Sequence, residues 1–166
     1  SSLQMIGWQD TDSDGIFDVL DVPLSLSGTG SYNTAAGQYE FSGTSSVETL
    51  DNLNPNGYGH DITTNTVDRI QYRLDGGAWT DGNTYGTYQP EVAQDVTVTA
   101  AGSHTIDLRT VFEETGVTSN VVSDTFEVTA AVDHFDWGPI GSPQTVGEAF
   151  GVTLTAKDDG GATVTD

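Results

Sequence analysis

VDRIQYRLDGGAW, residues 67–79, is the stretch that decides the fold, because it combines a strand pattern with a turn. Within residues 67–74, Ile70, Tyr72 and Leu74 alternate with charged and polar residues, which predicts a strand with one buried face and one solvent face. Asp75-Gly76-Gly77 follows at once, and it is a strong turn signal because glycine adopts positive φ angles freely. The stretch therefore predicts a β-hairpin in an antiparallel sheet.

The same two-residue period recurs on both sides of this hairpin, and no segment resembles a long helix. Clusters of Gly, Asn and Asp separate the apolar runs, as expected for strands joined by turns. The predicted strands span residues 23–26, 38–43, 67–74, 96–99, 104–111 and 122–128. Strands at this density over about 100 residues favour an all-β chain built as an antiparallel, immunoglobulin-sized β-sandwich. The three arginines lie on predicted outer faces, where we expect them to pair with aspartates.

Charge limits the partners of the chain. Its 166 residues include 25 acidic and 4 basic side chains, for a formal net charge of −21. So negative a surface repels phosphate backbones and anionic lipids, which argues against binding to nucleic acid or to membranes. No apolar run approaches the roughly 20 residues of a membrane span, and no secretory leader opens the sequence, so we expect a soluble mature segment. The excess of acidic side chains favours cations as partners in an extracellular setting. The alternative is an acidic surface selected only for solubility.

Residues 10–21, DTDSDGIFDVLD, have the spacing of a calcium-binding loop. Acidic residues occupy positions 1, 3, 5, 9 and 12, and glycine occupies position 6, where a sharp turn brings both halves of the loop onto one ion. The predicted Ca²⁺ ligands are the carboxylates of Asp10, Asp12, Asp14, Asp18 and Asp21 and the main-chain carbonyl of Ile16. The alternative is a solvated acidic turn.

Two features separate this loop from an EF-hand. Position 12 is Asp21 rather than the longer Glu, and Pro23 prevents a helix from following the loop. A calcium sensor opens a helix pair, so this sequence favours structural clamping over regulation. Over these residues alone, the loop resembles the calcium repeats of the thrombospondin type 3 family and dockerin loops; dockerins carry two such loops, so the resemblance does not imply cohesin binding. We expect calcium to fix residues 1–21 against the sandwich, with Trp8 and Phe17 packed at its edge.

The predicted sandwich resembles the bacterial immunoglobulin-like modules of large surface proteins. The resemblance rests on residues 70–79, 102–110 and 119–129, and it implies spacing, adhesion or assembly outside the cell rather than chemistry. The tail from Asp133 resembles the first strands of another such module, through residues 142–145 and 152–158.

These patterns predict three parts in the chain. Residues 1–21 form a calcium-binding loop segment, and residues 22–131 form an immunoglobulin-like sandwich. Residues 132–166 form a partial second module or a strand-donating tail, since two strands with an apolar face cannot bury that face alone.

We find no catalytic signature and expect no enzymatic activity. There is no His-Glu-x-x-His, Gly-x-Ser-x-Gly or phosphate-binding glycine loop, there is no cysteine, and His60, His104 and His134 are isolated from one another in the sequence. The three histidines are expected at surface or boundary positions. Chance carboxylate pairs are expected in so acidic a chain, and an isopeptide crosslink at Lys157 is a minor alternative.

The sequence favours a calcium-stabilised structural spacer of an extracellular or cell-surface protein, with neighbouring immunoglobulin-like modules as partners. The first alternative is a filament subunit, in which the tail strands complete an identical subunit head to tail. A further alternative is a glycan-binding region, with Tyr58, Trp79, Tyr85 and Tyr88 as a stacking platform. The last is an accessory region of a secreted peptidase, because residues 5–8 resemble the segment that follows some catalytic domains.

Overall fold

The computed structural model describes residues 9–50, 61 and 63–164. Within that part of the chain every regular element is a β-strand, and all pairings between strands are antiparallel, as the sequence predicts. The strands are β1 (Leu24–Asn33), β2 (Gln38–Val47), β3 (Val67–Leu74), β4 (Thr80–Thr87), β5 (Glu91–Thr97), β6 (Gly102–Val111), β7 (Val122–Val128), β8 (His134–Trp137) and β9 (Leu154–Lys157).

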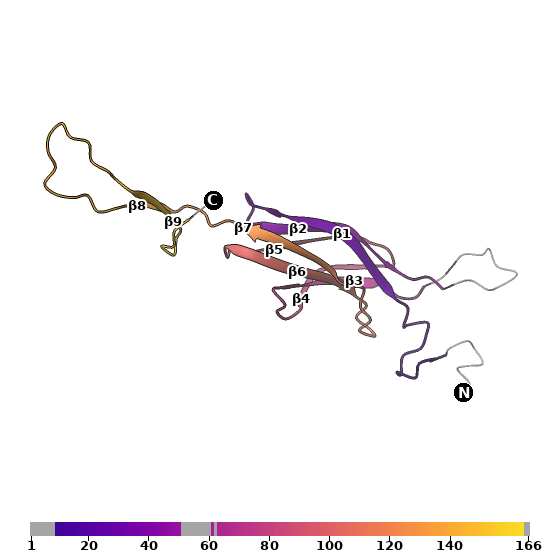
Figure 1. Cartoon of the computed structure of the whole chain (residues 1–166). Helices are drawn as coiled ribbons and strands as arrows, with labels where there is room; N and C mark the ends of the chain where they lie inside the picture. Colours follow the sequence, from indigo (N-terminus) through magenta and orange to yellow (C-terminus); the bar gives the residue numbers. More distant parts are fainter. Residues whose placement is uncertain (1–8, 51–60, 62, 165–166) are drawn as a thin grey trace.

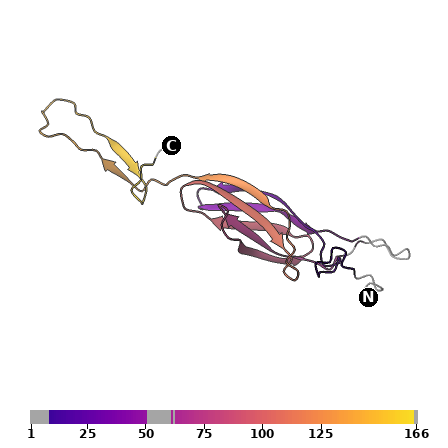
Figure 2. The same ribbon diagram turned by 60° about the horizontal axis from the view of Figure 1, so that its bottom comes forward.

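The strands form two facing sheets and one small separate sheet (Figure 1). One facing sheet has the order β1-β2-β5, and the other has the order β4-β3-β6-β7. These seven strands fall within the predicted range 22–131. Strands β8 and β9 fall within 132–166 and project from one end of the pair of sheets, away from the N-terminal loop (Figure 2). The arrangement is that of a β-sandwich with a small hairpin beyond it.

The main core lies between the two facing sheets. Its members come from both sheets and include Phe41 of β2, Ile70 of β3 and Leu108 of β6, all at most 2% exposed. A smaller cluster closes the end of the sandwich next to the N-terminal loop; its buried members are Val22, Leu24, Val47, Val67 and Phe112. The sandwich therefore has a distinct apolar cap on the side from which the loop enters.

Two strands differ from their predicted extents for a common reason. β1 continues to Asn33 although its apolar alternation is interrupted after Leu26: glycines take the next two inward positions, 28 and 30, before Tyr32 packs against the core. A Cβ atom at Gly28 would lie 2.6 Å from Cζ of Phe41, and one at Gly30 would meet the ring of Tyr39. Rings from β2 thus fill the space that side chains of β1 would need, and β2 itself runs beyond residue 43 to keep the pairing.

Other boundaries were missed because the strands carry few apolar residues. β4 has the sequence TDGNTYGT, pairs with β3 through register shifts, and was predicted only as the second arm of a hairpin. In the tail, β9 lies within the predicted stretch 152–158, whereas residues 142–145 form no strand and the partner strand is β8 at His134–Trp137. The strand predicted at residues 96–99 overlaps only the last two residues of β5, which begins at Glu91, and the strand predicted at 104–111 begins two residues late.

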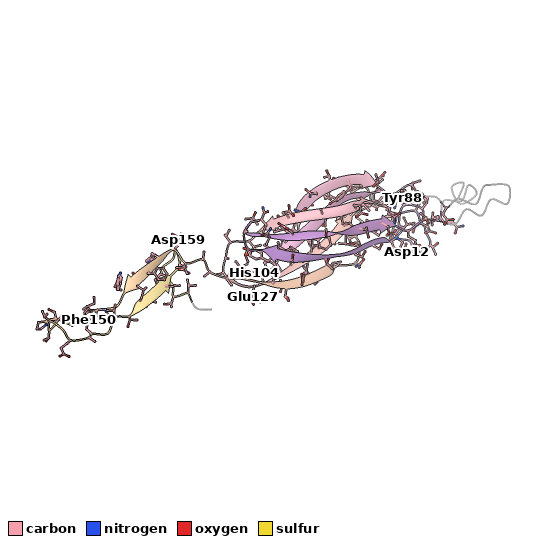
Figure 3. The ribbon with its side chains drawn as sticks, turned by 90° about the horizontal axis from the view of Figure 1, so that it is seen from above. Asp12, Tyr88, His104, Glu127, Phe150 and Asp159 are labelled. Atoms are coloured by element: carbon pink, nitrogen blue, oxygen red, sulfur yellow. The ribbon has the colours of Figure 1, made fainter. Side chains whose placement is uncertain are left out.

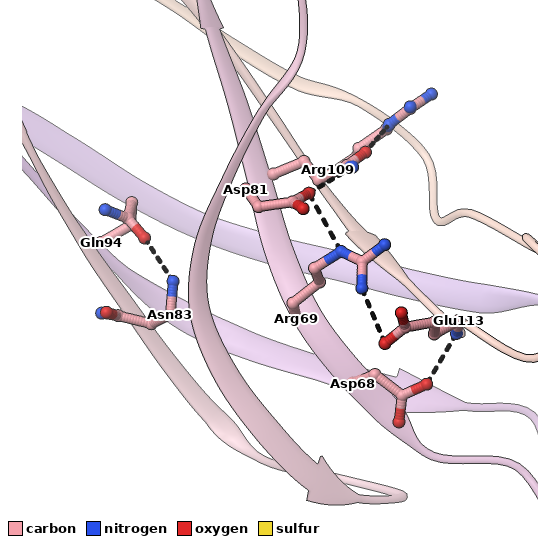
Figure 4. A network of polar contacts seen from close by, with 8 residues as sticks. Asp68, Arg69, Asp81, Asn83, Gln94, Arg109 and Glu113 are labelled. Atoms are coloured by element: carbon pink, nitrogen blue, oxygen red, sulfur yellow. Dashed lines mark hydrogen bonds and ion pairs between the residues drawn. The ribbon is translucent and has the colours of Figure 1, made fainter.

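Arg69 and its acidic neighbours form a network on the outer face of the larger sheet (Figure 4). Its guanidinium lies 3.0 Å from Oδ1 of Asp81 and 2.8 Å from Oε2 of Glu113, and the amide of Glu113 donates to Asp68. The predicted pairing of arginine with aspartate is confirmed here.

A second outer-face cluster surrounds Trp79. Arg73 pairs with Asp107 directly across the strands, at 2.8 Å. Arg109 instead donates to Oε1 of Gln71 at 3.0 Å, so the prediction that it pairs with an aspartate was wrong. The guanidinium groups of Arg73 and Arg109 lie 4.6 and 4.1 Å from the centre of the Trp79 ring. The indole therefore joins two adjacent cations by cation–π contacts, which stabilise an otherwise repulsive arginine pair.

Candidate metal centre

Three carboxylates of the N-terminal loop converge on one point. Asp10, Asp12 and Asp14 each place an oxygen within 4.8 Å of the others, and Asp10 is partly buried while the other two are exposed. Carboxylate oxygens are the ligands that calcium prefers, so this group could hold a metal ion and is compatible with Ca²⁺.

The turn that gathers these side chains is built by the loop itself. Asp10 accepts hydrogen bonds from the amides of Ser13, at 2.8 Å, and Gly15, at 3.2 Å. Asp14 accepts from the amide of Ile16 at 2.7 Å. Gly15 has a φ of 95°, which L-residues rarely adopt, so glycine at position 6 is required for the chain to fold back. The alternating acidic positions therefore meet because of local backbone geometry.

Asp18 takes a different place from the three converging carboxylates. Its Oδ1 accepts from the Thr11 amide at 2.8 Å and its Oδ2 accepts from the Thr11 hydroxyl at 2.7 Å. These two bonds, the hydroxyl first, hold the pKa of Asp18 below its usual value. The Asp18 amide also donates to the carbonyl of Gln9 at 2.7 Å. Asp18 therefore ties the two ends of the loop together.

Asp21 follows a turn at the end of the loop, and its carboxylate is not one of the three that meet within 4.8 Å. The amides of Leu20 and Asp21 both donate to the carbonyl of Phe17, at 2.7 and 3.1 Å. Burial raises the pKa of Asp21, and nearby negative charges raise it further. Those charges belong to Asp14, Asp12, Asp18 and Asp10. The negative charges of the other four predicted carboxylate ligands therefore act on Asp21. A bound cation would neutralise these charges.

The loop is attached to the end of the sandwich that carries the smaller apolar cluster, and Asp12 marks its place in Figure 3. The side chain of Asn65 donates to the carbonyl of Leu20 at 2.8 Å, and Thr64 reaches the carbonyl of Val19 at 3.4 Å. Val22 follows the loop and is 4% exposed within that cluster. No feature of the sequence singled out Thr64 or Asn65, since both lie in a polar run far from the loop.

The described residues of the predicted glycan-stacking platform do not lie on one common surface. Trp79 lies against Arg73 and Arg109 on an outer face, whereas the ring of Tyr85 packs against the core clusters. Tyr88 is 52% exposed near the loop end (Figure 3). Tyr58, together with Trp8 and His60, lies outside the described residues.

His104 is held on both sides. Its Nδ1 lies 2.8 Å from Oδ2 of Asp75 and its Nε2 lies 2.9 Å from the carbonyl of Ala100. The Asp75 contact first, and then the carbonyl, raise the pKa of His104. Two acceptors on one ring favour the doubly protonated form, which fastens the turn after β3 to the turn after β5. The side chain is 13% exposed, which is a boundary position of the kind that the sequence predicts.

Lys157 donates to the Thr163 hydroxyl at 3.1 Å, which gives no support to the isopeptide alternative. Among the described residues, none forms a helix of the length and apolar character needed to cross a bilayer. A comparison with family models, curated proteins and solved structures finds no match to this chain.

Proposed function

We propose that this chain is a non-catalytic structural spacer of an extracellular or cell-surface protein, in which calcium stiffens the entry to an immunoglobulin-like sandwich. The observation that carries the proposal is the convergence of Asp10, Asp12 and Asp14 in a loop that is bonded to the end of the sandwich. Carboxylates this close repel one another unless a cation lies between them.

The proposed ligand set follows the loop positions. Asp10, Asp12 and Asp14 supply carboxylate oxygens. Ile16 at position 7 supplies its carbonyl, and Asp21 at position 12 supplies the last carboxylate. Asp18 stands at position 9, where such loops often act through a water molecule, in keeping with its bonds to Thr11.

The arrangement of the chain supports a spacer. The N-terminal loop and the β8–β9 hairpin lie at opposite ends of the sandwich (Figures 1 and 2). A neighbouring module on either side would therefore continue the long axis of the molecule. A calcium ion at the N-terminal end would reduce bending at that junction, because the loop would be fixed both within itself and against the sandwich.

Calcium should raise the free energy of unfolding by about 1.4 to 2.7 kcal/mol at concentrations tenfold to a hundredfold above its dissociation constant. The reason is that only the folded loop assembles the full ligand set. The measurement is urea-induced unfolding in calcium and in EDTA, together with limited proteolysis of residues 9–21.

The control for this experiment is a pair of variants. Asp12→Asn combined with Asp14→Asn removes two converging carboxylates and should abolish the calcium effect. Asp95→Asn, on an exposed position of β5, removes negative charge elsewhere and should leave it intact. Identical unfolding curves and identical cleavage of the wild type in calcium and in EDTA would refute the calcium role.

A second candidate function rests on the exposed apolar face of the β8–β9 hairpin. Phe135 and Trp137 lie opposite Ala156 and Leu154 in the strand register, so these four side chains share one face. Phe135 is 57% exposed, Trp137 is 70% exposed and Leu154 is 52% exposed. A two-stranded sheet with an open apolar face is marginally stable alone, which favours a covering partner. We propose an adjacent module or, in a filament, an identical subunit.

The Trp137→Ser variant distinguishes an identical subunit from an adjacent module as the partner that covers the hairpin. If identical subunits cover the hairpin, the wild type should show a concentration-dependent molar mass by light scattering, and Trp137→Ser should return it to about 17.5 kDa. Val146→Ser alters a fully exposed residue in the hairpin loop and should not change the mass. A wild type that stays at the monomer mass at all concentrations would exclude the filament and leave the spacer.

A further inference from the structure

The three arginines of this chain lie together on the outer face of one sheet. Arg69 and Arg73 belong to β3, Arg109 belongs to β6, and the remaining basic residue, Lys157, lies outside the sandwich in β9. The three strands of the facing sheet contain neither arginine nor lysine. In a chain with a formal net charge of −21, the arginine charge is therefore confined to one face of the sheet β4-β3-β6-β7.

Arg109 differs from the other two arginines in its partners. Arg69 and Arg73 are both paired with carboxylates. Arg109 forms no ion pair with any of the described residues, and its Nε donates instead to Oε1 of Gln71 at 3.0 Å. Its two Nη groups have no acceptor in the same part of the chain. Arg109 lies beside the Arg69 network (Figure 4), yet its own charge is left without a counter-ion.

The carboxylates on neighbouring strands do not neutralise Arg109, because they are already paired. Asp81 is held by Arg69 at 3.0 Å, and Asp107 is held by Arg73 at 2.8 Å and by a serine hydroxyl of β7. Burial, and then the positive charge of Arg73, lower the pKa of Arg109, since both disfavour its charged form. An anion bound against this guanidinium would offset both effects.

The surroundings of Arg109 indicate what kind of anion fits. The half-buried indole of Trp79 lies 4.1 Å from the guanidinium of Arg109 and 4.6 Å from that of Arg73, measured to the ring centre. A guanidinium binds a carboxylate through two parallel hydrogen bonds, and an aromatic ring next to it offers apolar surface to the rest of the ligand. The site therefore suits a carboxylate attached to a compact body.

The sheet itself favours a sugar over a peptide. β3 and β6 are each hydrogen-bonded to a strand on both sides, so neither has a free edge to which an extended peptide could add as a strand. A sugar ring needs no strand edge, because it can lie flat against side chains of the outer face.

The net charge limits how acidic the ligand can be. A chain of −21 repels polymers with dense negative charge, such as nucleic acids. A glycan with one carboxylate on an otherwise neutral chain meets far less repulsion, and its single charge matches the single unpaired arginine.

We propose that Arg109, together with Arg73 and Trp79, binds the carboxylate of an acidic sugar in a glycan on the outer face of the sheet β4-β3-β6-β7. This activity goes beyond the role of a spacer, because it would attach the sandwich to a glycan. It does not involve the N-terminal loop, so it is independent of calcium.

The test is an NMR titration with glucuronate, in which the indole signal of Trp79 and the Nε signal of Arg109 are followed. Glucuronate should shift both signals along a saturable curve, whereas glucose, which lacks the carboxylate, should shift neither. Added salt should weaken binding, because the contact is between charges. The curve should be the same in calcium and in EDTA, so a failure of the proposed calcium function leaves this inference standing.

Three variants identify the charge that binds. Arg109→Gln removes a charged hydrogen-bonding group and should weaken glucuronate binding by about 10- to 100-fold. Arg109→Lys keeps the charge but loses the fork, so it should bind with intermediate affinity, and it serves if the glutamine variant does not fold. Lys157→Gln removes the same charge from β9 and should bind as the wild type does.

Four results would overturn the proposal. Signals of Trp79 and Arg109 that do not respond to glucuronate would show that this face does not bind the acidic sugar, and wild-type affinity in Arg109→Gln would show that Arg109 is not the binding group. Acetate that binds as tightly as glucuronate would show that the sugar ring is not recognised. An acetylated Gly-Asp-Gly peptide amide that binds as tightly would assign the site to acidic peptides instead.

Discussion

Replacing Leu108 with alanine is expected to lower the free energy of unfolding by about 2–5 kcal/mol, the usual range for a buried leucine. Leu108 is fully buried in β6, which is paired on one side with β3 and on the other with β7. Strands hydrogen-bonded on both sides cannot easily move into the space left by the missing carbons, so most of the cavity should remain. Urea-induced unfolding measures the loss.

Val121→Ala is the control for Leu108. Val121 precedes β7 and is 45% exposed, so its truncation should change the free energy of unfolding by less than about 0.5 kcal/mol. Equal and small effects at both positions would mean that the two facing sheets do not enclose the core described above.

Gly43→Ala should destabilise the sandwich by about 1–3 kcal/mol or more, although it adds a single methyl group. Gly43 lies directly opposite Gly28 in the pairing of β2 with β1. A Cβ atom at Gly43 would overlap the carbonyl oxygen of Ser27 and lie 2.7 Å from Cα of Gly28. Both are main-chain atoms, so no rotamer change relieves the contact and the two strands must separate.

Gly151→Ala is the matched control for Gly43. An added Cβ atom there would have no neighbour within 4 Å, and the residue has no positive φ. Thermal unfolding of both variants should show a clear loss for Gly43→Ala and no loss for Gly151→Ala. A Gly43→Ala protein with wild-type stability would show that β1 and β2 are not in this register.

The strands that could be predicted are those in which apolar side chains alternate with polar ones along the sequence. β3 and β7 were predicted with their observed bounds, because most of their inward positions are occupied by their own apolar side chains. The turn after β3 was also predicted, and Asp75 and Gly76 there have φ angles of 50° and 70°. The continuation of β1 past Leu26 could not be predicted, since its next two inward residues are Gly28 and Gly30, which are covered by the rings of Phe41 and Tyr39 from another strand.

The candidate site divides in the same way. Asp10, Asp12 and Asp14 could be predicted because a turn of a few residues brings them together, and spacing alone describes such a turn. The attachment of the loop could not, because Asn65 lies 45 residues from Leu20 in the sequence. Only the folded sandwich brings that amide to the loop.

The path of the chain also determines how the sandwich would respond to a pulling force. β1 and the segment before β7 run parallel, as the bridge between Leu24 and Ser119 shows, and the Asn120 side chain bonds both the amide and the carbonyl of Leu26 at 2.9 Å. The chain enters at one end of the sandwich and leaves toward β8 at the other (Figure 1). Tension on the two ends would slide β1 past β7 and load these contacts together, in shear, instead of opening them one by one. The hydrogen bonds of Asn120 would then resist the sliding of β1 along the long axis of the molecule.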